Sequence, residues 1–405
     1  MTLMETARTE KIKSIDSNQF LELFDRAKNI KKAVDHLYKT IDNQVLRNQV
    51  VDLVENHYDL GLVQDVYEVF GGYTNRSFGV ICNKNGVSSE YFIRKYKAEA
   101  LDEDVILEHK LIMYAIEHGF TEAPCIFATN DGATFVKIRE IFDGKPKDRI
   151  FSVYEYLTGK DEYTWIDNES TPEELKNLGA LLARLHHCTR NFDPGHIIKA
   201  EPKIELLFPD MKRIFTRLAA QSLDTKFHGY FGICLPRLMD AIDRNIISAE
   251  DYAQMPQTPI HGDFHAGNVK FDKGNVVGLF DFDWSKIDVR LFDICLGLVY
   301  CCSSWHVATD GQMRLNDCRH FLEGYNGALD NSGLQKLNEA EKNNFAKMMT
   351  TAAIYLVYWC TELWYYLDPE SANDHESIYY LNHFLRNIKW LEAHHADLTN
   401  LATDI

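Results

Sequence analysis

Two carboxylates and one carboxamide between residues 261 and 283 are the strongest chemical signal in this sequence. Asp263 and Asn268 lie five residues apart in the segment HGDFHAGN, and Asp281 follows an apolar stretch. Phosphoryl transfer needs one carboxylate beside the attacking hydroxyl and hard oxygen ligands for magnesium on the nucleotide phosphates. A loop can present Asp263 and Asn268 together, and a hairpin can return the chain to Asp281. We therefore predict Asp263 as the catalytic base and Asn268 and Asp281 as magnesium ligands.

The same spacing occurs in the kinase catalytic loop H-R-D-x-x-x-x-N, which precedes a D-F-G sequence. His261, Asp263 and Asn268 occupy the matching positions, with glycine in place of the arginine, and residues 281–283 read DFD. Two alternatives stay open. The polar residues could form turns, or His261 and His265 could be loop histidines or zinc ligands. Because glycines interrupt the histidine pair, a helical zinc site is disfavoured and a kinase is favoured.

The elements that must position these residues change type along the chain. Residues 18–58 have the apolar spacing of two helices. Short β-branched and aromatic segments follow, with Asn85-Gly86 as a tight hairpin turn, and Thr171-Pro-Glu-Glu later begins a helix with a capping box. We predict strands at 66–70, 77–81, 91–96, 134–139, 151–156, 269–271 and 276–280, and helices at 102–118, from 171 onward, and at 203–222, 235–247, 312–329, 340–367 and 376–396.

This order, a small β-rich half and then a larger helical half, predicts an α+β fold in three parts. Residues 1–59 form an N-terminal helical extension. Residues 60–157 form a β-rich part with one helix. Residues 158–405 form a helical part that contains the candidate residues 261–283.

The string HGDFHAGNV followed by DFD resembles the signature of the aminoglycoside phosphotransferase and choline kinase-like family. That family includes kinases of antibiotics, choline, ethanolamine, homoserine and methylthioribose. The resemblance is specific over residues 260–294 and looser but collinear over residues 60–190. It implies a bilobal protein-kinase-like fold, with ATP and Mg²⁺ between a small β-rich N-lobe and a larger α-helical C-lobe. Residues 60–157 would be the N-lobe, with a nucleotide-binding β-sheet and one helix, and residues 158–405 the C-lobe, with the catalytic loop and the substrate pocket.

The resemblance also implies contacts to the ATP phosphates. Gly71, Gly72 and Asn75 lie between two predicted strands, where a phosphate-covering loop belongs and where glycines let backbone amides approach phosphate oxygens. A plain hairpin turn is the alternative. Arg94 follows three apolar residues and is the candidate cation for the phosphates. Lys95 is its neighbour, but strand alternation sends its side chain to the opposite face.

Three further positions follow from the same resemblance. Glu108 is the helix glutamate expected to pair with the phosphate-binding cation, although a solvated glutamate in the first turn is the alternative. Glu155 and Tyr156 lie in the segment expected to connect the lobes, whose backbone would bind adenine, and Glu155 could equally be a surface residue. Asp293 is expected to brace the catalytic loop.

The acceptor is expected to be a small molecule. Only eleven residues separate Asp281 from Asp293, and no A-P-E sequence follows, so a protein kinase's peptide-docking segment has no room. Protein phosphorylation is the weaker alternative.

Four residues are candidates for lining the acceptor pocket: Asp283, Trp284, Trp359 and Glu362. If the strand before Asp281 continues, Asp283 would point in the same direction as Asp281. Trp359 and Glu362 would lie on one long helix, where aromatic faces and a carboxylate suit an amine, although a core stripe is the alternative. We predict an amino alcohol, amino sugar or aminoglycoside-like acceptor. Homoserine, a neutral sugar, or a catalytically silent nucleotide-binding protein remain alternatives.

Composition and charge argue against some classes of partner and cellular location. The 405-residue chain carries a formal net charge of -17, which argues against nucleic acid or an anionic membrane as a partner. The N-terminus lacks the apolar core of a signal peptide, and no apolar stretch approaches the roughly 20 residues of a spanning helix. Nine cysteines without a C-x-x-C pair favour a reducing, cytoplasmic location. The sequence does not determine the oligomeric state.

Overall fold

The computed structural model describes residues 44–69, 75–142, 144–330, 336–367, 369 and 372–403, and the contacts divide the chain into two compact units. The first unit ends at Lys97 and the second begins at Ala98. The first of the two predicted N-terminal helices lies outside the described residues, as do Gly71 and Gly72.

Over its described residues, 44–69 and 75–97, the first unit holds one helix and three strands. Helix α2 (Gln44–His57) packs against β1 (Leu62–Val69), which pairs antiparallel with β2 (Arg76–Lys84), and β2 pairs antiparallel with β3 (Val87–Lys95). The turn between β2 and β3 has positive φ angles of 56° at Asn85 and 85° at Gly86, which confirms the predicted tight hairpin. Buried apolar side chains from all four elements form the core of this unit: Val50, Leu53, Val54, Val66, Phe78, Val80 and Ile93.

The second unit begins with a helix and a hairpin. Helix α3 (Asp102–Glu117) carries three acidic residues in its first turn, where the helix dipole favours negative charge. Strands β4 (Val136–Phe142) and β5 (Lys145–Glu155) pair antiparallel. Because α3 contacts α4 and the turn that carries Asp283, it belongs by contacts to the second unit. The predicted lobe boundary at residue 157 stays a prediction.

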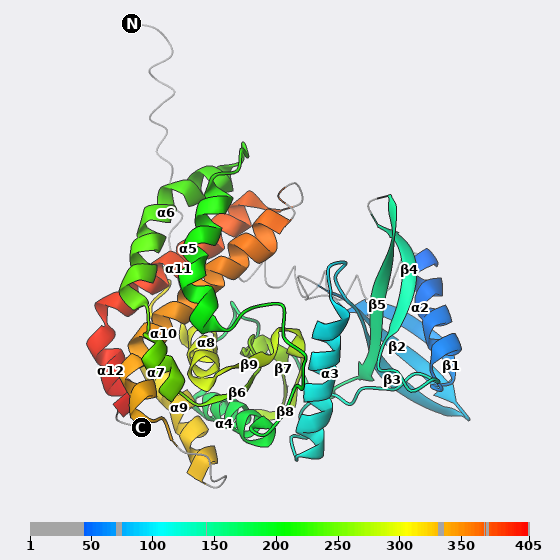
Figure 1. Ribbon diagram of the computed structural model, residues 1–405. Coiled ribbons are helices and arrows are strands. Elements are labelled where there is room, and N and C mark those ends of the chain that lie inside the picture. The colour runs from blue at the N-terminus through cyan, green and yellow to red at the C-terminus, as the bar shows by residue number, and fades with distance from the viewer. Residues whose placement is uncertain are drawn as a thin grey trace, which may run out of the picture. The chain divides into compact units, whose positions relative to one another are not determined.

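Two long helices cross at very close range in the second unit. Helix α4 (Pro172–Thr189) begins with the predicted capping box, in which Thr171 Oγ1 accepts from Glu174 N at 3.3 Å. Helix α9 (Leu315–Asp330) lies along α4 (Figure 1). A Cβ atom at Gly179 would lie 1.9 Å from Phe321 O, and one at Gly324 would lie 2.0 Å from Lys176 O. The two backbones therefore touch, which only glycine allows.

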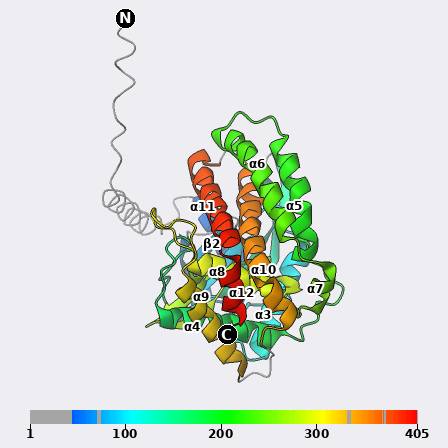
Figure 2. The same ribbon diagram turned by 90° about the vertical axis from the view of Figure 1, so that its left-hand side faces the viewer.

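Further helices pack together in the remainder of this unit. Helices α5 (Ile204–Ala219), α6 (Lys226–Asn245), α10 (Glu339–Tyr358) and α11 (Asp374–Ala393) lie side by side, as both views show (Figures 1 and 2). Helices α7 (Ala249–Gln254) and α12 (His395–Thr403) both contact α10. Among the described residues, no helix is long and apolar enough to cross a membrane.

Two small antiparallel sheets hold the loops that carry the candidate chemistry. Strand β6 (Gln257–Ile260) pairs with β9 (Lys286–Val289), and β7 (Val269–Asp272) pairs with β8 (Asn275–Leu279). The chain runs from β6 through residues 261–268 into β7, and from β8 through residues 280–285 into β9. Helix α8 (Arg290–Cys302) follows β9 at once.

Several predicted boundaries are wrong for physical reasons. Helix α8 was not predicted, because all its residues are buried and it has no polar face to reveal a helical period. Strands β6 and β9, of four residues each, were not predicted; β6 contains Pro259 and β9 contains Lys286 and Asp288, residue types that strand patterns disfavour. Helix α6 begins at Lys226 instead of 235, and the predicted helix 340–367 is α-helical only to Tyr358. A π-helical turn (Trp359–Trp364) and a 3₁₀ turn (Tyr365–Leu367) follow.

We predict that Gly179→Ala lowers the midpoint of thermal unfolding by several degrees, because the new methyl group would force α4 and α9 apart. Overpacking of this kind costs about 1–3 kcal/mol. Gly229→Ala in α6 is the matched control, since nothing lies within 4 Å of its Cβ position. It should stabilise by about 0.5–1 kcal/mol, because alanine favours the helix. Equal effects of the two substitutions in a thermal unfolding scan would contradict the close approach of the helices.

Candidate active site

The predicted base and one predicted metal ligand are in direct contact. Asn268 Nδ2 donates to the backbone oxygen of Asp263 at 2.9 Å and to its carboxylate Oδ2 at 3.2 Å. Asn268 is buried, whereas the Asp263 side chain keeps 22% of its surface exposed. Because the amide nitrogen makes both bonds, Asn268 Oδ1 is the end of the amide left to accept or coordinate. The loop thus offers two oxygen groups of different chemistry side by side.

A buried carboxylate holds this loop from behind. Asp293, in the first turn of α8, accepts the backbone N–H groups of His261 at 2.8 Å and Gly262 at 3.0 Å. His186 Nε2 contacts the same carboxylate at 3.0 Å. Burial raises the pKa of Asp293, but the hydrogen bonds from His186 and the backbone outweigh burial and hold that pKa below its ordinary value. Asp293 lies where the sequence predicted a brace.

The turn that carries Asp281 has an unusual backbone. Asp281 has φ 69° and ψ 58°, the left-handed conformation that residues other than glycine rarely adopt. A 3₁₀ turn, Phe282–Trp284, follows directly. The expectation that the strand continues and aligns Asp281 with Asp283 is wrong, because β8 ends at Leu279 and the chain turns sharply.

The two loops are joined through backbone contacts. Phe280 N donates to Asn268 O at 3.0 Å, and the His261 ring nitrogen Nε2 lies 3.0 Å from Phe280 O. Gly262 has φ 78°, and a Cβ there would lie 2.5 Å from Trp284 O. Glycine at 262 therefore allows the catalytic loop to lie against the turn that carries Asp281.

Tyr300, which the sequence patterns did not reveal, is a further neighbour of Asp263. Burial raises the pKa of the Tyr300 phenol well above its usual value, and the Asp263 carboxylate adds to this shift. The rings of His265 and Tyr300 have centroids 4.9 Å apart, and His265 Nε2 lies 3.7 Å from Asp263 Oδ2. Both rings therefore flank the candidate base.

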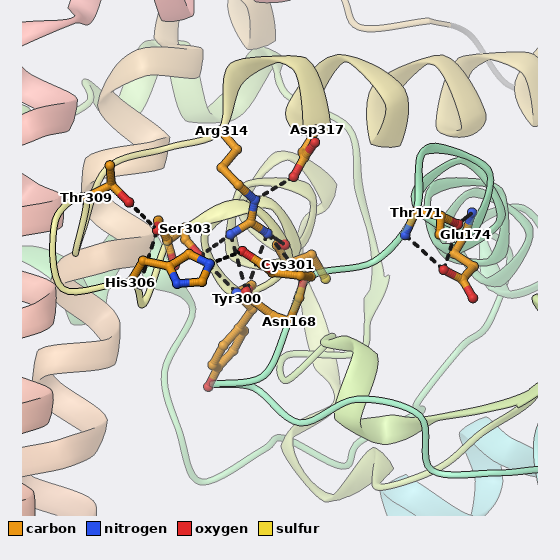
Figure 3. Close-up of polar contacts among 12 residues, drawn as sticks. Asn168, Thr171, Glu174, Tyr300, Cys301, Ser303, His306, Thr309, Arg314 and Asp317 are labelled. Atoms are coloured by element: carbon orange, nitrogen blue, oxygen red, sulfur yellow. Dashed lines mark hydrogen bonds and ion pairs between the residues drawn. The ribbon is translucent and has the colours of Figure 1, made fainter. Parts of the chain in front are cut away.

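A polar cluster fixes the end of α8, which carries Tyr300 (Figure 3). Arg314 donates to the carbonyls of Cys301 at 2.8 Å and Ser303 at 2.9 Å, and Asn168 Nδ2 donates to Tyr300 O at 2.5 Å. These contacts satisfy carbonyls that a helix end leaves without intrahelical partners. A short sequence motif could not have predicted these contacts, because Asn168 and Tyr300 are 132 residues apart.

The predicted phosphate-binding residues lie in the first unit as far as they are described. Arg94 and Lys95 are both buried at the end of β3, so burial does not separate them. Asn75 Oδ1 accepts from Lys97 N at 2.9 Å. Gly71 and Gly72 lie outside the described residues.

Glu108 is buried in α3 rather than solvated, and its carboxylate accepts from the Tyr154 hydroxyl at 3.1 Å. His109 Nε2 lies 2.9 Å from the same hydroxyl. Glu155 is exposed at the end of β5 and accepts from Cys125 N at 3.1 Å, and Tyr156 follows it, half-buried. Because Glu108 and Arg94 belong to different units, their pairing stays a prediction.

The predicted acceptor-lining residues fall into two groups. Asp283 and Trp284 are half-buried in the turn after Asp281. Trp359 and Glu362 lie in the π-helical turn after α10, and such turns often occur at functional sites. The ring of Trp359 is 5.4 Å from that of Trp364, and Glu362 forms an ion pair with Arg217 at 2.5 Å.

A second group of aromatic residues, led by Trp165, was missed. A Cβ at Gly267 would lie 3.2 Å from Thr164 Cα, so the segment 161–169 lies against the catalytic loop. From Trp165, ring contacts run to Tyr380 at 4.6 Å, to Trp305 at 5.4 Å and to Tyr300 at 6.5 Å. The signal in the sequence was Trp165 within DEYTWIDNE, a tryptophan among four carboxylates.

The donor chemistry fits a magnesium–nucleotide complex. Among the described residues, no three His, Cys, Asp or Glu side chains form a metal-binding cluster. Magnesium on nucleotide phosphates uses one or two protein ligands together with phosphate oxygens and water. One amide oxygen at Asn268 and one carboxylate at Asp281 meet that need with hard donors, whereas zinc prefers nitrogen and sulfur ligands.

Comparison with known proteins agrees with this chemistry. The family model described as "Phosphotransferase enzyme family" matches residues 66–330. A homoserine kinase of Ralstonia nicotianae is 23% identical over 334 residues, which cover 80% of this chain and 88% of that protein. A homoserine kinase of Methylobacillus glycogenes is 26% identical over 306 residues, covering 76% and 81%.

Solved structures show the same fold. A microcompartment-associated aminopropanol kinase has a TM-score of 0.62 at 14% identity, over 87% of this chain and 98% of that chain. A spectinomycin phosphotransferase in complex with ADP and spectinomycin has a TM-score of 0.56 at 15% identity, over 88% and 97%. The predicted α+β, bilobal, protein-kinase-like fold is therefore confirmed.

We predict that Asp293→Asn destabilises the protein by about 3 kcal/mol, because an amide would oppose backbone N–H donors with its own N–H₂. The folded-state pKa of Asp293 is below the value of about 3.9 in an unfolded chain, so its stabilisation is present above that pH. It is lost as the pH falls through the folded-state pKa.

Urea unfolding between pH 3 and pH 7 tests this. The difference between the wild type and Asp293→Asn should be largest at neutral pH and shrink in acid. Asp272→Asn, at an exposed position in the β7–β8 hairpin, is the control and should change stability little. A difference that does not vary with pH would show that Asp293 is not ionised in the folded protein.

Proposed function

We propose that Asp263 is the catalytic base of this protein. The premise is that the chain belongs to the phosphotransferase enzyme family and is a kinase of a small molecule. The single observation that carries the proposal is the contact between Asn268 Nδ2 and the Asp263 carboxylate at 3.2 Å. This bond directs one carboxylate oxygen, and Asp263 keeps enough exposure for an acceptor hydroxyl to reach it. Asp263 orients that hydroxyl and accepts its proton during the transfer.

Asn268 Oδ1 and the Asp281 carboxylate are the proposed magnesium ligands. Magnesium supplies charge neutralisation on the phosphate oxygens when it is bound. The backbone bond between Phe280 and Asn268 holds the two ligand-bearing loops together, and the left-handed backbone of Asp281 sets the direction of its side chain. The reaction forms the bond between the acceptor oxygen and the γ-phosphorus of ATP and breaks the bond from that phosphorus to the β–γ bridging oxygen, so ADP leaves; the proton of the hydroxyl passes to Asp263 Oδ.

ATP is the proposed phosphoryl donor. Arg94 is the proposed cation for its phosphates, with Glu108 as the carboxylate that braces it, and Lys95 is the alternative. Gly71, Gly72 and Asn75 would cover the phosphates, and the backbone at Glu155 and Tyr156 would bind adenine. The buried position of Glu108 in α3 supports a paired carboxylate, because an unpaired buried charge is costly. A cytoplasmic location, where ATP is available and thiols stay reduced, is part of the proposal.

The proposed acceptor is a hydroxyl compound that carries an amine. Trp165 lies in a segment of four carboxylates against the catalytic loop, and its ring contacts lead to Tyr300 beside Asp263. Aromatic faces and carboxylates attract an ammonium group. The solved aminopropanol kinase and spectinomycin phosphotransferase have the same fold, which supports an amino alcohol or aminoglycoside-like compound.

Homoserine is the second candidate, favoured by two observations. Several curated relatives that cover most of this chain are homoserine kinases, at 22–26% identity. Arg217 and Glu362 stand together as a cation and an anion, with exposed side-chain fractions of 51% and 25%, so they could receive the carboxylate and the ammonium of an amino acid.

We predict that Asp263→Asn lowers turnover by about 10³-fold or more, since it removes the proton acceptor. Binding of Mg²⁺ and a non-hydrolysable ATP analogue, measured by calorimetry, should stay within about twofold of the wild type. Asp272→Asn should leave both unchanged, because it is exposed and outside the site. Near-normal turnover in Asp263→Asn would show that another group takes the proton.

We predict that Trp165→Leu raises the KM for an amine acceptor about tenfold and leaves the KM for ATP unchanged, because it removes a cation–π face. ADP release is first measured with amino alcohols, aminoglycosides, homoserine and neutral sugars to identify the acceptor. Trp390→Leu, at a half-buried tryptophan that stacks on His394 in the last turn of α11, is the matched control. Turnover only with neutral sugars, or an unchanged acceptor KM in Trp165→Leu, would refute the amine subsite.

A further inference from the structure

A short segment just before α5 contacts four elements around the active site. Residues 199–202, here named the strap, reach α3, the turn that carries Asp281, strand β9 and helix α10. No motif or family signature drew attention to it in the sequence. Its contacts are polar and several of them are buried. Two of them involve the turn that carries Asp281 and helix α3, which contacts that turn.

Lys199 makes the contact to the turn that carries Asp281, residues 280–285, here named the metal turn. Its Nζ donates to the backbone oxygen of Asp283 at 2.5 Å and lies 3.9 Å from the carboxylate of Asp104. The next residue, Ala200, donates its backbone N–H to the same carboxylate at 3.1 Å. Only 11% of the Lys199 side chain is exposed. Lys199 therefore lies between the first turn of α3 and the turn that follows Asp281, with a polar contact to each.

The strap itself is firmly anchored on its other side. Glu201 pairs with Lys286 at 2.8 Å, with exposed side-chain fractions of 9% and 3%, and accepts from the Tyr355 hydroxyl at 3.1 Å. Lys286 also donates to Pro202 O at 2.7 Å. A buried ion pair with its remaining hydrogen bonds satisfied fixes geometry, because any displacement leaves a charge unpaired. The position of Lys199 is thus set by the fold and not by chance contact.

The metal turn needs such support. The left-handed conformation of Asp281 costs roughly 1 kcal/mol or more and persists only where neighbours enforce it. The catalytic loop enforces it from one side, where Gly262 lies against Trp284 and Ser285 Oγ donates to His261 O at 3.2 Å. Lys199 approaches the same turn from the strap, through the carbonyl two residues beyond Asp281.

We propose that Lys199 is a positioning residue for phosphoryl transfer, which holds the turn after Asp281 in the conformation that presents its carboxylate to magnesium. The inference rests on the proposed role of Asp281 as a metal ligand. Lys199 touches neither substrate nor metal in this scheme. It acts through the backbone oxygen of Asp283, and its contact with Asp104 couples the turn to α3, the helix that carries Glu108.

Lys199→Met tests this, because methionine keeps much of the length and apolar body but removes the charge and the donors. We expect the affinity for an ATP analogue in the presence of Mg²⁺, measured by calorimetry, to fall about tenfold, as for the loss of a charge-assisted hydrogen bond. The affinity for the same analogue in EDTA should stay within about twofold. The Mg²⁺ concentration for half-maximal turnover should rise.

Lys203→Met is the matched control. Lys203 lies four residues further on, and its Nζ donates to Gln257 at 2.5 Å, at the exposed first residue of β6. It should bind the analogue like the wild type with and without Mg²⁺. Lys199→Arg keeps a cationic donor and should recover at least half of the lost affinity, which general damage to the fold would not allow.

Equal losses of affinity with Mg²⁺ and in EDTA would overturn the proposal, since Lys199 would then act on the nucleotide site or on folding in general. Wild-type affinity and Mg²⁺ dependence in Lys199→Met would overturn it as well. Asp281→Asn separates a failure of the metal-ligand assignment of Asp281 from a failure of the role proposed for Lys199. If Asp281→Asn keeps normal Mg²⁺ dependence, the proposed metal ligand is wrong. If it loses that dependence while Lys199→Met does not, only the role of Lys199 fails.

Discussion

The carboxylate of Asp293 is buried in the first turn of α8, where it accepts the backbone N–H groups of His261 and Gly262 at 2.8 and 3.0 Å. Moving a carboxylate out of water costs several kcal/mol unless donors replace the lost hydration. Two backbone amides and His186 supply those donors here. The loop supplies its two backbone donors only in this one conformation. Any other loop conformation would leave the buried Asp293 carboxylate without them and would therefore be higher in free energy. The position of Asp263 follows from that difference in free energy.

The turn that carries Asp281 depends in its own way on neighbours. Its left-handed backbone is not favoured by aspartate itself, so its conformation must be stabilised by the packing around it. Gly262 permits the catalytic loop to lie against this turn, since any larger residue would collide with Trp284 O. The same glycine therefore serves the loop that Asp293 holds and the turn that presents Asp281. Changes at either loop must reach the other through this contact.

Sequence patterns predicted the elements whose signals are local. The hairpin at Asn85-Gly86 and the cap at Thr171 were confirmed, because each depends on a few adjacent residues. The contact of Asp263 with Asn268 follows from one short loop and could also be expected. Helix α8 could not, because a fully buried helix has no polar face. His186 could not either, since the carboxylate that it contacts behind the loop is 107 residues away in sequence.

The residues proposed for the reaction have local sequence signals, whereas those proposed to surround the acceptor do not. The proposed base, its amide neighbour and the brace at Asp293 all lie within residues 261–293, so one continuous segment carries the chemistry. The aromatic residues that contact Trp165 come from separate segments: Trp165 itself lies in the loop before α4, Tyr300 on α8 beside Asp263, and Tyr380 on α11. A side-chain change in one of these elements can alter that surface without moving the catalytic loop, which has its own buried support. The family model over residues 66–330 therefore identifies a phosphotransferase, whereas the acceptor must be argued from the side chains that surround Asp263.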